Sequence, residues 1–76
     1  MSEQEQPPQF VICLDNKEYE VSLETWKIYQ ALPDSEASQR GYLRIIDESG
    51  EDYLYAADRF TPIALPQKAV EAFPKR

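Results

Sequence analysis

Histidine is absent from this chain of 76 residues, which excludes serine–histidine and cysteine–histidine catalysis as well as imidazole metal ligands. The single cysteine excludes an internal disulfide and a thiolate zinc site. No apolar run approaches the roughly 18 residues of a membrane span. At this length we expect one domain with a small core, and we expect no cofactor, no metal and no enzymatic activity.

The charge balance is acidic, with 14 Asp and Glu against 8 Lys and Arg and a formal net charge of -6. A duplex binder needs several cations on one face, and the basic residues here are scattered along the chain. A small basic face could still form from Lys27, Arg44 and Arg59. The same acidic charge disfavours anionic membranes. The acidic start of the chain is the reverse of a signal peptide, and together with the lone thiol it predicts a cytoplasmic protein.

The first part of the chain is predicted to be a tail followed by a hairpin. Residues 1–8 are polar and end in Pro-Pro, which predicts a disordered tail. β-branched and aromatic residues at 10–14 predict a strand. After a polar turn, apolar residues alternate with polar ones at 19–23, as in a half-buried second strand. The apolar positions of that strand are Tyr19, Val21 and Leu23.

The next segment is less regular. Residues 25–32 contain Thr, Trp, Ile and Tyr, which favour a strand, although a helix with a weak apolar stripe stays open. Pro33 ends this element. Asp34 can then cap a single helical turn over residues 35–39, and Gly41 can close that turn.

A second hairpin is the clearest element of the sequence. Two strands, at residues 42–46 and 53–55, flank an acidic tip in which Gly50 supplies a positive φ. A short helical turn is predicted at 56–59, and an edge strand is predicted at 60–63.

Prolines mark the end of the chain. Pro62 lacks a hydrogen-bond donor that an edge strand can spare, and Pro66 can begin a short amphipathic helix that Pro74 ends. The predicted organisation is therefore a tail at 1–8, an all-β five-stranded small barrel with short helical turns at 9–64, and a short C-terminal helix and tail at 65–76.

The order of elements resembles the SH3-like barrel, most closely over residues 41–63. There a hairpin with an acidic tip leads into a helical turn and a last strand opened by an aromatic residue, in the run Tyr55-Ala56-Ala57-Asp58-Arg59-Phe60. The chain is also similar to small bacterial proteins with an Asp-Glu-Ser-Gly-Glu-Asp-Tyr-Leu-Tyr hairpin, a likeness that implies no activity. SH3 domains that bind proline-rich peptides have a tryptophan where Gly41-Tyr42 stands here, so that specificity is not expected.

Aromatic residues are the main candidates for a binding surface. If Leu54 points into the core, Tyr53 and Tyr55 share the opposite face of the sheet. Five tyrosines are difficult to bury together in so small a chain, so an exposed patch for a protein or peptide is predicted. The alternative is that these rings form cross-strand pairs that cover a sheet face. The predicted surface comprises Trp26, Tyr29, Tyr42, Tyr53, Tyr55 and Phe60.

Two other features have plain structural interpretations. The acidic tip could hold a cation, but adjacent acids on an extended chain point to opposite faces, so a solvated tip that aids solubility is predicted. The tip acids are Asp47, Glu48, Glu51 and Asp52. Cys13 has no basic neighbour in its strand and is expected to be an inert buried thiol.

These observations favour a non-catalytic protein–protein interaction module that is a monomer or a weak homo-oligomer. Its acidic loops would steer a basic protein or peptide partner toward the aromatic surface. One alternative is a small barrel that binds single-stranded nucleic acid, with cations beside tyrosines that stack on bases. The other is an accessory subunit of a larger assembly.

Overall fold

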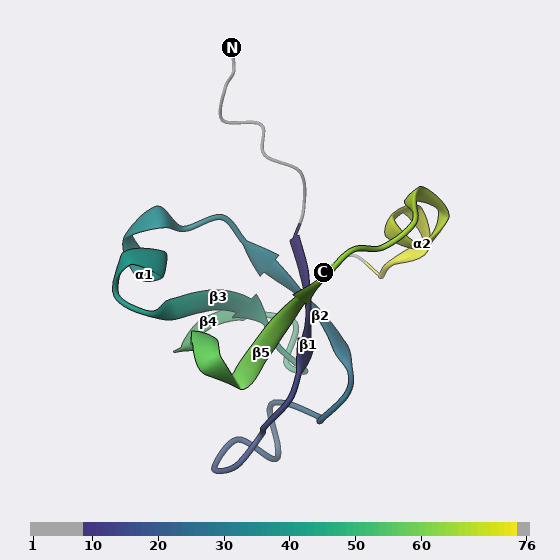
Figure 1. Ribbon diagram of the computed structural model, residues 1–76. Helices are drawn as coiled ribbons and strands as arrows, with labels where there is room; N and C mark the ends of the chain where they lie inside the picture. Colours follow the sequence, from purple (N-terminus) through teal and green to yellow (C-terminus); the bar gives the residue numbers. More distant parts are fainter. Residues whose placement is uncertain (1–8, 75–76) are drawn as a thin grey trace.

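The computed structural model describes residues 9–74 and contains one antiparallel sheet with the strand order β4-β3-β2-β1-β5 (Figure 1). The predicted disordered tail and the last two residues lie outside the described range. The elements are β1 (Gln9–Cys13), β2 (Ile28–Leu32), α1 (Ser35–Gln39), β3 (Tyr42–Ile46), β4 (Asp52–Ala56), η1 (Ala57–Arg59), β5 (Phe60–Ile63) and α2 (Gln67–Ala72).

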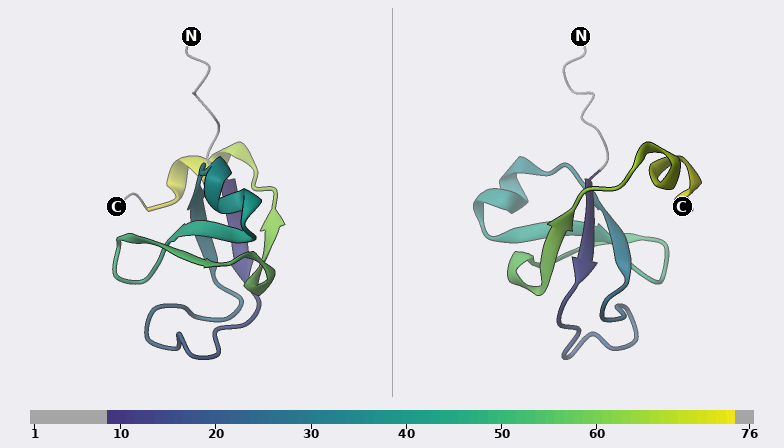
Figure 2. Two further views of the ribbon diagram at one scale, coloured as in Figure 1. Left: turned by 90° about the vertical axis from the view of Figure 1, so that its left-hand side faces the viewer. Right: turned by 45° about the vertical axis from the view of Figure 1, so that its right-hand side comes forward.

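The all-β prediction is confirmed, because strands dominate and the helices are short. Strands β1, β2 and β5 run alongside one another, and β3 and β4 pass across them (Figures 1 and 2). The sheet therefore coils around its own apolar face. Within residues 9–74 no pairing joins β4 to β5, so the sheet stays open along that side.

The core lies on the inner face of this coiled sheet. Cys13, Leu23 and Ile45 are its fully buried side chains, and they come from β1, the β1–β2 loop and β3. Cys13 is free and buried, as predicted, and burial raises the pKa of its thiol. At the far end of β1, Phe10 meets Phe73 edge to face, with ring centroids 4.7 Å apart, and this contact anchors the chain just after α2.

Several local predictions are confirmed. Asp34 caps α1 by accepting the N–H of Ala37 at 2.9 Å, and Gly41 follows the helix with a φ of 84°. Gly50 turns the second hairpin with a φ of 85°. The helical turn η1 and the edge strand with Pro62 both lie where the sequence places them. The C-terminal helix also forms, although it begins after Pro66 rather than with it.

The predicted strand at 19–23 is wrong, because residues 14–27 form a loop of successive turns. The carbonyl of Tyr19 accepts the N–H groups of both Ser22 and Leu23, at 3.0 and 2.9 Å, as in a helical turn. A helical turn brings positions four apart together and sends the middle position outward. Consequently Val21 is 93 % exposed, whereas Leu23 is 0 % exposed.

A β-bulge joins this loop to β2. The N–H of Trp26 donates to the carbonyl of Cys13 at 2.6 Å, and the N–H of Cys13 donates to the carbonyl of Lys27 at 3.0 Å. This pattern normally has a left-handed glycine as its first residue, but Trp26 occupies the position with a φ of 64°. The strand predicted for residues 25–32 is confirmed only from Ile28 onward, because the bulge precedes it.

We expect Trp26→Gly to be more stable than Trp26→Ala by about 1 kcal/mol in free energy of unfolding. Both substitutions remove the indole, which is 75 % exposed, so they lose similar packing. Glycine also relieves the left-handed strain, while alanine keeps the Cβ that causes it. Urea denaturation followed by circular dichroism measures the difference. Equal stabilities would show that the bulge carries no strain.

Candidate functional site at the β4 edge

Three of the six aromatic residues predicted to form the binding surface lie in the core. Tyr29, Tyr55 and Phe60 are buried, so this part of the predicted surface is wrong. The rings of Tyr55 and Phe60 meet edge to face, with centroids 6.2 Å apart. Two carboxylates make the burial of tyrosine possible, because Tyr29 donates its hydroxyl hydrogen to Glu48 and Tyr55 donates to Asp47.

The other three predicted residues are exposed. Trp26 lies in the β1–β2 loop, while Tyr42 and Tyr53 lie on the paired strands β3 and β4. Tyr42 is 44 % exposed and Tyr53 is 52 % exposed. The structure therefore reduces the predicted aromatic surface to two tyrosines beside the β4 edge and one tryptophan in a loop.

Leu54 completes the exposed face at this edge, so the condition that it points into the core is not met, although Tyr53 and Tyr55 do share the opposite face of the sheet. It pairs across the strands with Arg44, so both side chains project to the outer face of the sheet together with Tyr42. Leu54 is 46 % exposed there. Arg44 carries the sequence signal that identifies this face, because a guanidinium in the middle of a strand points toward solvent. Counting pairs back from Gly50 then places Leu54 opposite it.

Helix α1 stands beside this outer face, and a depression of about 200 Å³ lies between them. Arg44 lines this depression and is held by two carboxylates, with Nε 2.8 Å from Asp34 Oδ2 and Nη1 3.1 Å from Asp52 Oδ2. Hydrogen bonds to these two carboxylates raise the pKa of Arg44 further. The depression is lined by Asp34, Glu36, Ala37, Arg40, Tyr42, Arg44 and Leu54.

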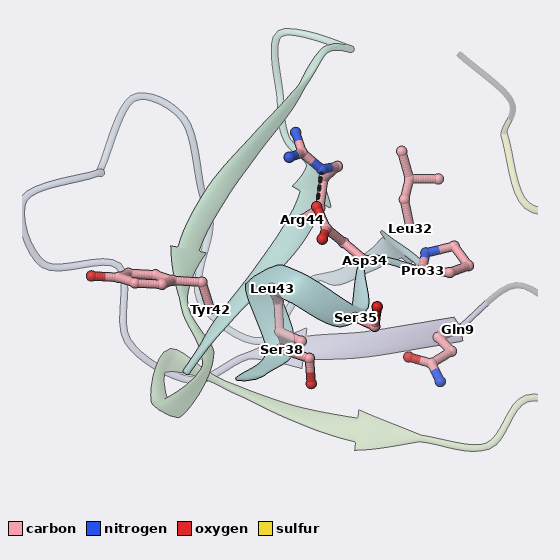
Figure 3. A pocket seen from close by; sticks show the side chains of 9 residues that line it. All are labelled: Gln9, Leu32, Pro33, Asp34, Ser35, Ser38, Tyr42, Leu43 and Arg44. Atoms are coloured by element: carbon pink, nitrogen blue, oxygen red, sulfur yellow. Dashed lines mark hydrogen bonds and ion pairs between the residues drawn. The ribbon is translucent and has the colours of Figure 1, made fainter. Parts of the chain in front are cut away.

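A second cavity, of about 430 Å³, opens on the Ser35 and Ser38 side of α1 (Figure 3). The N–H of Ala37 and then Arg44 lower the pKa of its carboxylate, Asp34. The carboxylate of Asp34 is thus ionised and already paired. The hydroxyl groups of Ser35 and Ser38 are further hydrogen-bonding groups on this side of α1. It is lined by Gln9, Leu32, Pro33, Asp34, Ser35, Ser38, Tyr42, Leu43 and Arg44.

The two edges of the sheet differ in their capacity to add another strand. Within residues 9–74, β4 pairs with β3 alone and β5 pairs with β1 alone. Edge β5 carries Pro62, which has no N–H to offer. Edge β4 contains no proline and carries the exposed side chains of Tyr53 and Leu54. Of the two edges in the described part of the chain, β4 is therefore the one with the features of a docking surface.

The hairpin tip is partly structural rather than only a solvated loop. Asp47 is buried and accepts hydrogen bonds from the hydroxyls of Ser49 and Tyr55, both at 2.6 Å. Burial acts to raise the pKa of Asp47, but these hydrogen bonds outweigh it and hold the pKa below its ordinary value. The predicted solvated tip is wrong at this position. Across residues 9–74, no three acidic or cysteine side chains gather in a way that could hold a metal ion.

Glu48 and the tyrosines extend the same network. Lys27 and then Tyr29 donate hydrogen bonds that lower the pKa of Glu48. Its backbone N–H donates to the carbonyl of Ser22 at 3.0 Å, which ties the β1–β2 loop to the hairpin. Burial and the hydrogen bond to Asp47 raise the pKa of Tyr55 to about 12.

We expect the free energy of unfolding to be constant from about pH 5 to about pH 8 and to fall on both sides. Asp34, Asp47 and Glu48 have lowered pKa values, so their contribution is present above about pH 4 and is lost as the pH falls through those values. Cys13, Tyr29 and Tyr55 have raised pKa values, so the contribution of Cys13 is present below about pH 8.5, that of the tyrosines is present below about pH 10, and each is lost as the pH rises further.

Urea denaturation at a series of pH values measures this profile. The matched variant is Tyr55→Phe, which removes one hydroxyl and should lose less stability between neutral pH and about pH 12 than the wild type does. An identical alkaline loss in the two proteins would contradict the role given to Tyr55.

The three cations considered for nucleic-acid binding are each engaged. Lys27 Nζ lies 2.7 Å from Glu48 Oε2, and Arg44 bridges two carboxylates. Arg59 donates to the carbonyl of Lys17 at 2.7 Å and lies over the ring of Tyr19 at 4.9 Å. All three cations are therefore engaged in contacts within the fold, and Arg59 contacts the β1–β2 loop.

Comparison with known protein families, curated proteins and solved structures finds no match to this chain. No helix within residues 9–74 has both the length and the apolar composition that a bilayer crossing requires. The candidate site is therefore defined by its own geometry, as an open strand edge with Tyr42, Tyr53 and Leu54 around it.

Proposed function

We propose that this protein is a non-catalytic protein–protein interaction module whose docking surface is the β4 edge. One observation carries the proposal. Tyr53 and Leu54 are exposed on a strand that, within residues 9–74, pairs on one side only, while the opposite edge carries Pro62. Exposed aromatic and aliphatic side chains on an open edge are a liability unless a partner covers them, and tyrosine is enriched where proteins meet.

The proposal includes the finer fold assignment, an SH3-like barrel. It is supported by the strand order, by the crossing of β3 and β4 over the other strands, and by the helical turn η1 directly before the last strand. Small barrels of this kind serve many roles, so the fold alone does not select a partner. The lone free thiol of Cys13 is compatible with a reducing compartment, and on that ground we place the module in the cytoplasm.

Protein binding is favoured over nucleic-acid binding because the cations near the exposed rings are paired with carboxylates. Single-stranded nucleic acid would need cations beside the exposed rings, but Arg44 is held by two carboxylates at this site. A role as an accessory subunit of a larger assembly is a special case of the same docking surface.

Photo-cross-linking in the native cells tests this proposal. A benzophenone amino acid is introduced at Tyr42, at Tyr53 or, as a matched exposed control, at Lys68 on α2. We expect the same cross-linked protein at both tyrosine positions and none at Lys68. Capture from all three positions alike, or from Lys68 alone, would place the docking surface elsewhere.

A further inference from the structure

We infer that the β4 edge binds its partner by strand addition, and that the added strand is an extended segment with lysine or arginine at both ends. This inference rests on the proposed function and names the chemistry of the partner. It requires a backbone that offers hydrogen bonds, side-chain contacts on each face, and charges that select the segment.

The backbone hydrogen bonds fix which residues of β4 face outward. The N–H of Asp47 donates to the carbonyl of Glu51 at 3.1 Å, and the N–H of Ala57 donates to the carbonyl of Gly41 at 2.9 Å. Hydrogen-bonded pairs alternate in an antiparallel ladder, so every second residue between these points bonds to β3. Leu54 falls between those residues, and its N–H and carbonyl point away from β3.

The same counting shows why the other edge is closed. The N–H of Leu14 donates to the carbonyl of Arg59 at 2.7 Å, which places Pro62 at an outward position of β5. An outward proline offers no donor in the middle of that edge. The outward residue in the middle of β4 is Leu54, which retains its donor.

Side chains on both faces of β4 lie where they would contact alternate residues of an added strand. Leu54 and Tyr42 lie on the outer face, beside the depression against α1, and Tyr53 lies on the other face at the rim of the core. Alternate side chains of a strand point to opposite faces, so a segment with apolar residues on both faces would meet these three.

Charge selects the ends of the segment. Glu51 stands just before β4 and Asp58 just after it, and both are exposed. The cations beside the outer face are themselves paired with carboxylates: Arg44 with Asp34 and Asp52, and Arg40 with Glu36, whose Oε2 lies 3.7 Å from Arg40 Nη2. An added strand therefore has carboxylates near both of its ends, which favours cations there.

A second copy of this chain is a poorer occupant. Each copy carries a net charge of -6, and two antiparallel β4 edges would bring the acids before one strand toward the acids after the other. Like charges across such an interface are unfavourable. The occupant we select is therefore a basic segment of another protein.

Titration with a synthetic peptide, Lys-Lys-Val-Thr-Val-Thr-Val-Lys-Lys, tests the inference by NMR. We expect saturable shifts of the Leu54 amide and its neighbours. A peptide methylated at alternate backbone nitrogens keeps its charge but loses its donors, so it should bind about tenfold more weakly or worse. A peptide with glutamate in place of each lysine should not bind.

A protein-side variant gives an independent check. Leu54→Pro removes the outward N–H of β4, as Pro62 does in β5, and should abolish the shifts. Leu54→Ala keeps the N–H and should retain part of the binding. Equal binding of the methylated and unmethylated peptides would overturn strand addition. It would leave the proposed function standing if the Tyr42 and Tyr53 cross-links still formed. Self-association of the protein with the same Leu54 shifts, in place of peptide binding, would overturn the basic partner.

Discussion

Leu23→Ala is expected to lower the free energy of unfolding by about 2–5 kcal/mol. Leu23 is fully buried in the core although it is contributed by a loop, so its truncation leaves a cavity between the strands. Its carbonyl also accepts a hydrogen bond from Asn16 Nδ2 at 2.9 Å, which keeps the surrounding loop from collapsing freely into that cavity. Domains of this size have little stability in reserve, so this loss should bring the protein close to unfolding in water.

Val21→Ala is the matched control, because Val21 lies two residues away in the same loop and is 93 % exposed. Its effect should stay within about 0.5 kcal/mol. Urea denaturation of the two variants compares them directly. A half-buried strand would place both side chains on one face and make the two effects similar, so similar effects would contradict the loop described here.

Asp47→Ala is expected to cost about 2–3 kcal/mol, the second largest effect. The carboxylate of Asp47 accepts hydrogen bonds from Tyr55 and from both the hydroxyl and the N–H of Ser49. Its removal leaves the buried hydroxyl of Tyr55 without an acceptor and releases the turn at the hairpin tip. Thermal and urea unfolding measure the loss.

A double-mutant cycle with Tyr55→Phe separates the pair from the rest of the turn. We expect a coupling energy of about 1–2 kcal/mol between Asp47 and Tyr55. Glu51→Ala, at an exposed acid of the same tip, is the control and should change the stability by less than about 0.5 kcal/mol. Additive effects of the Asp47 and Tyr55 substitutions would show that their hydrogen bond contributes nothing.

The sequence predicts the part of this fold that follows Pro33 well because that part is organised by local chemistry. Asp34 caps a helix with its own side chain, Gly50 turns a hairpin through a positive φ, and Pro62 restricts its strand to an edge. Each signal acts within a few residues, so it can be recognised before any tertiary contact is known.

The β1–β2 loop could not be predicted in the same way because its structure depends on distant contacts. Tyr19, Val21 and Leu23 alternate as a strand would, but the hairpin tip binds Ser22 and the core takes up Leu23, so the segment forms turns. Trp26 adopts a conformation that favours glycine, which no propensity scale anticipates.

The candidate site was predicted only in part for a related reason. Tyr29 and Tyr55 have polar ends that suggest exposure, yet each finds a carboxylate many residues away, and that partner permits burial. Leu54 is apolar, which is compatible with a core position, but its cross-strand neighbour Arg44 fixes it on the outer face. Burial of these side chains follows from the register and from the hydrogen-bond partners, and composition reports neither.

The unequal edges of the sheet also bear on the stoichiometry of any complex. Strand addition to a sheet with two open edges can continue, because every added strand exposes a new edge and the growing polymer has two reactive ends. Here Pro62 terminates one end, so growth in that direction stops at the protein itself. At the β4 edge, strand addition would stop after the partner segment if the sequence of that segment prevents a further strand from pairing with it. The asymmetry thus favours a complex of one protein with one segment and opposes fibril formation.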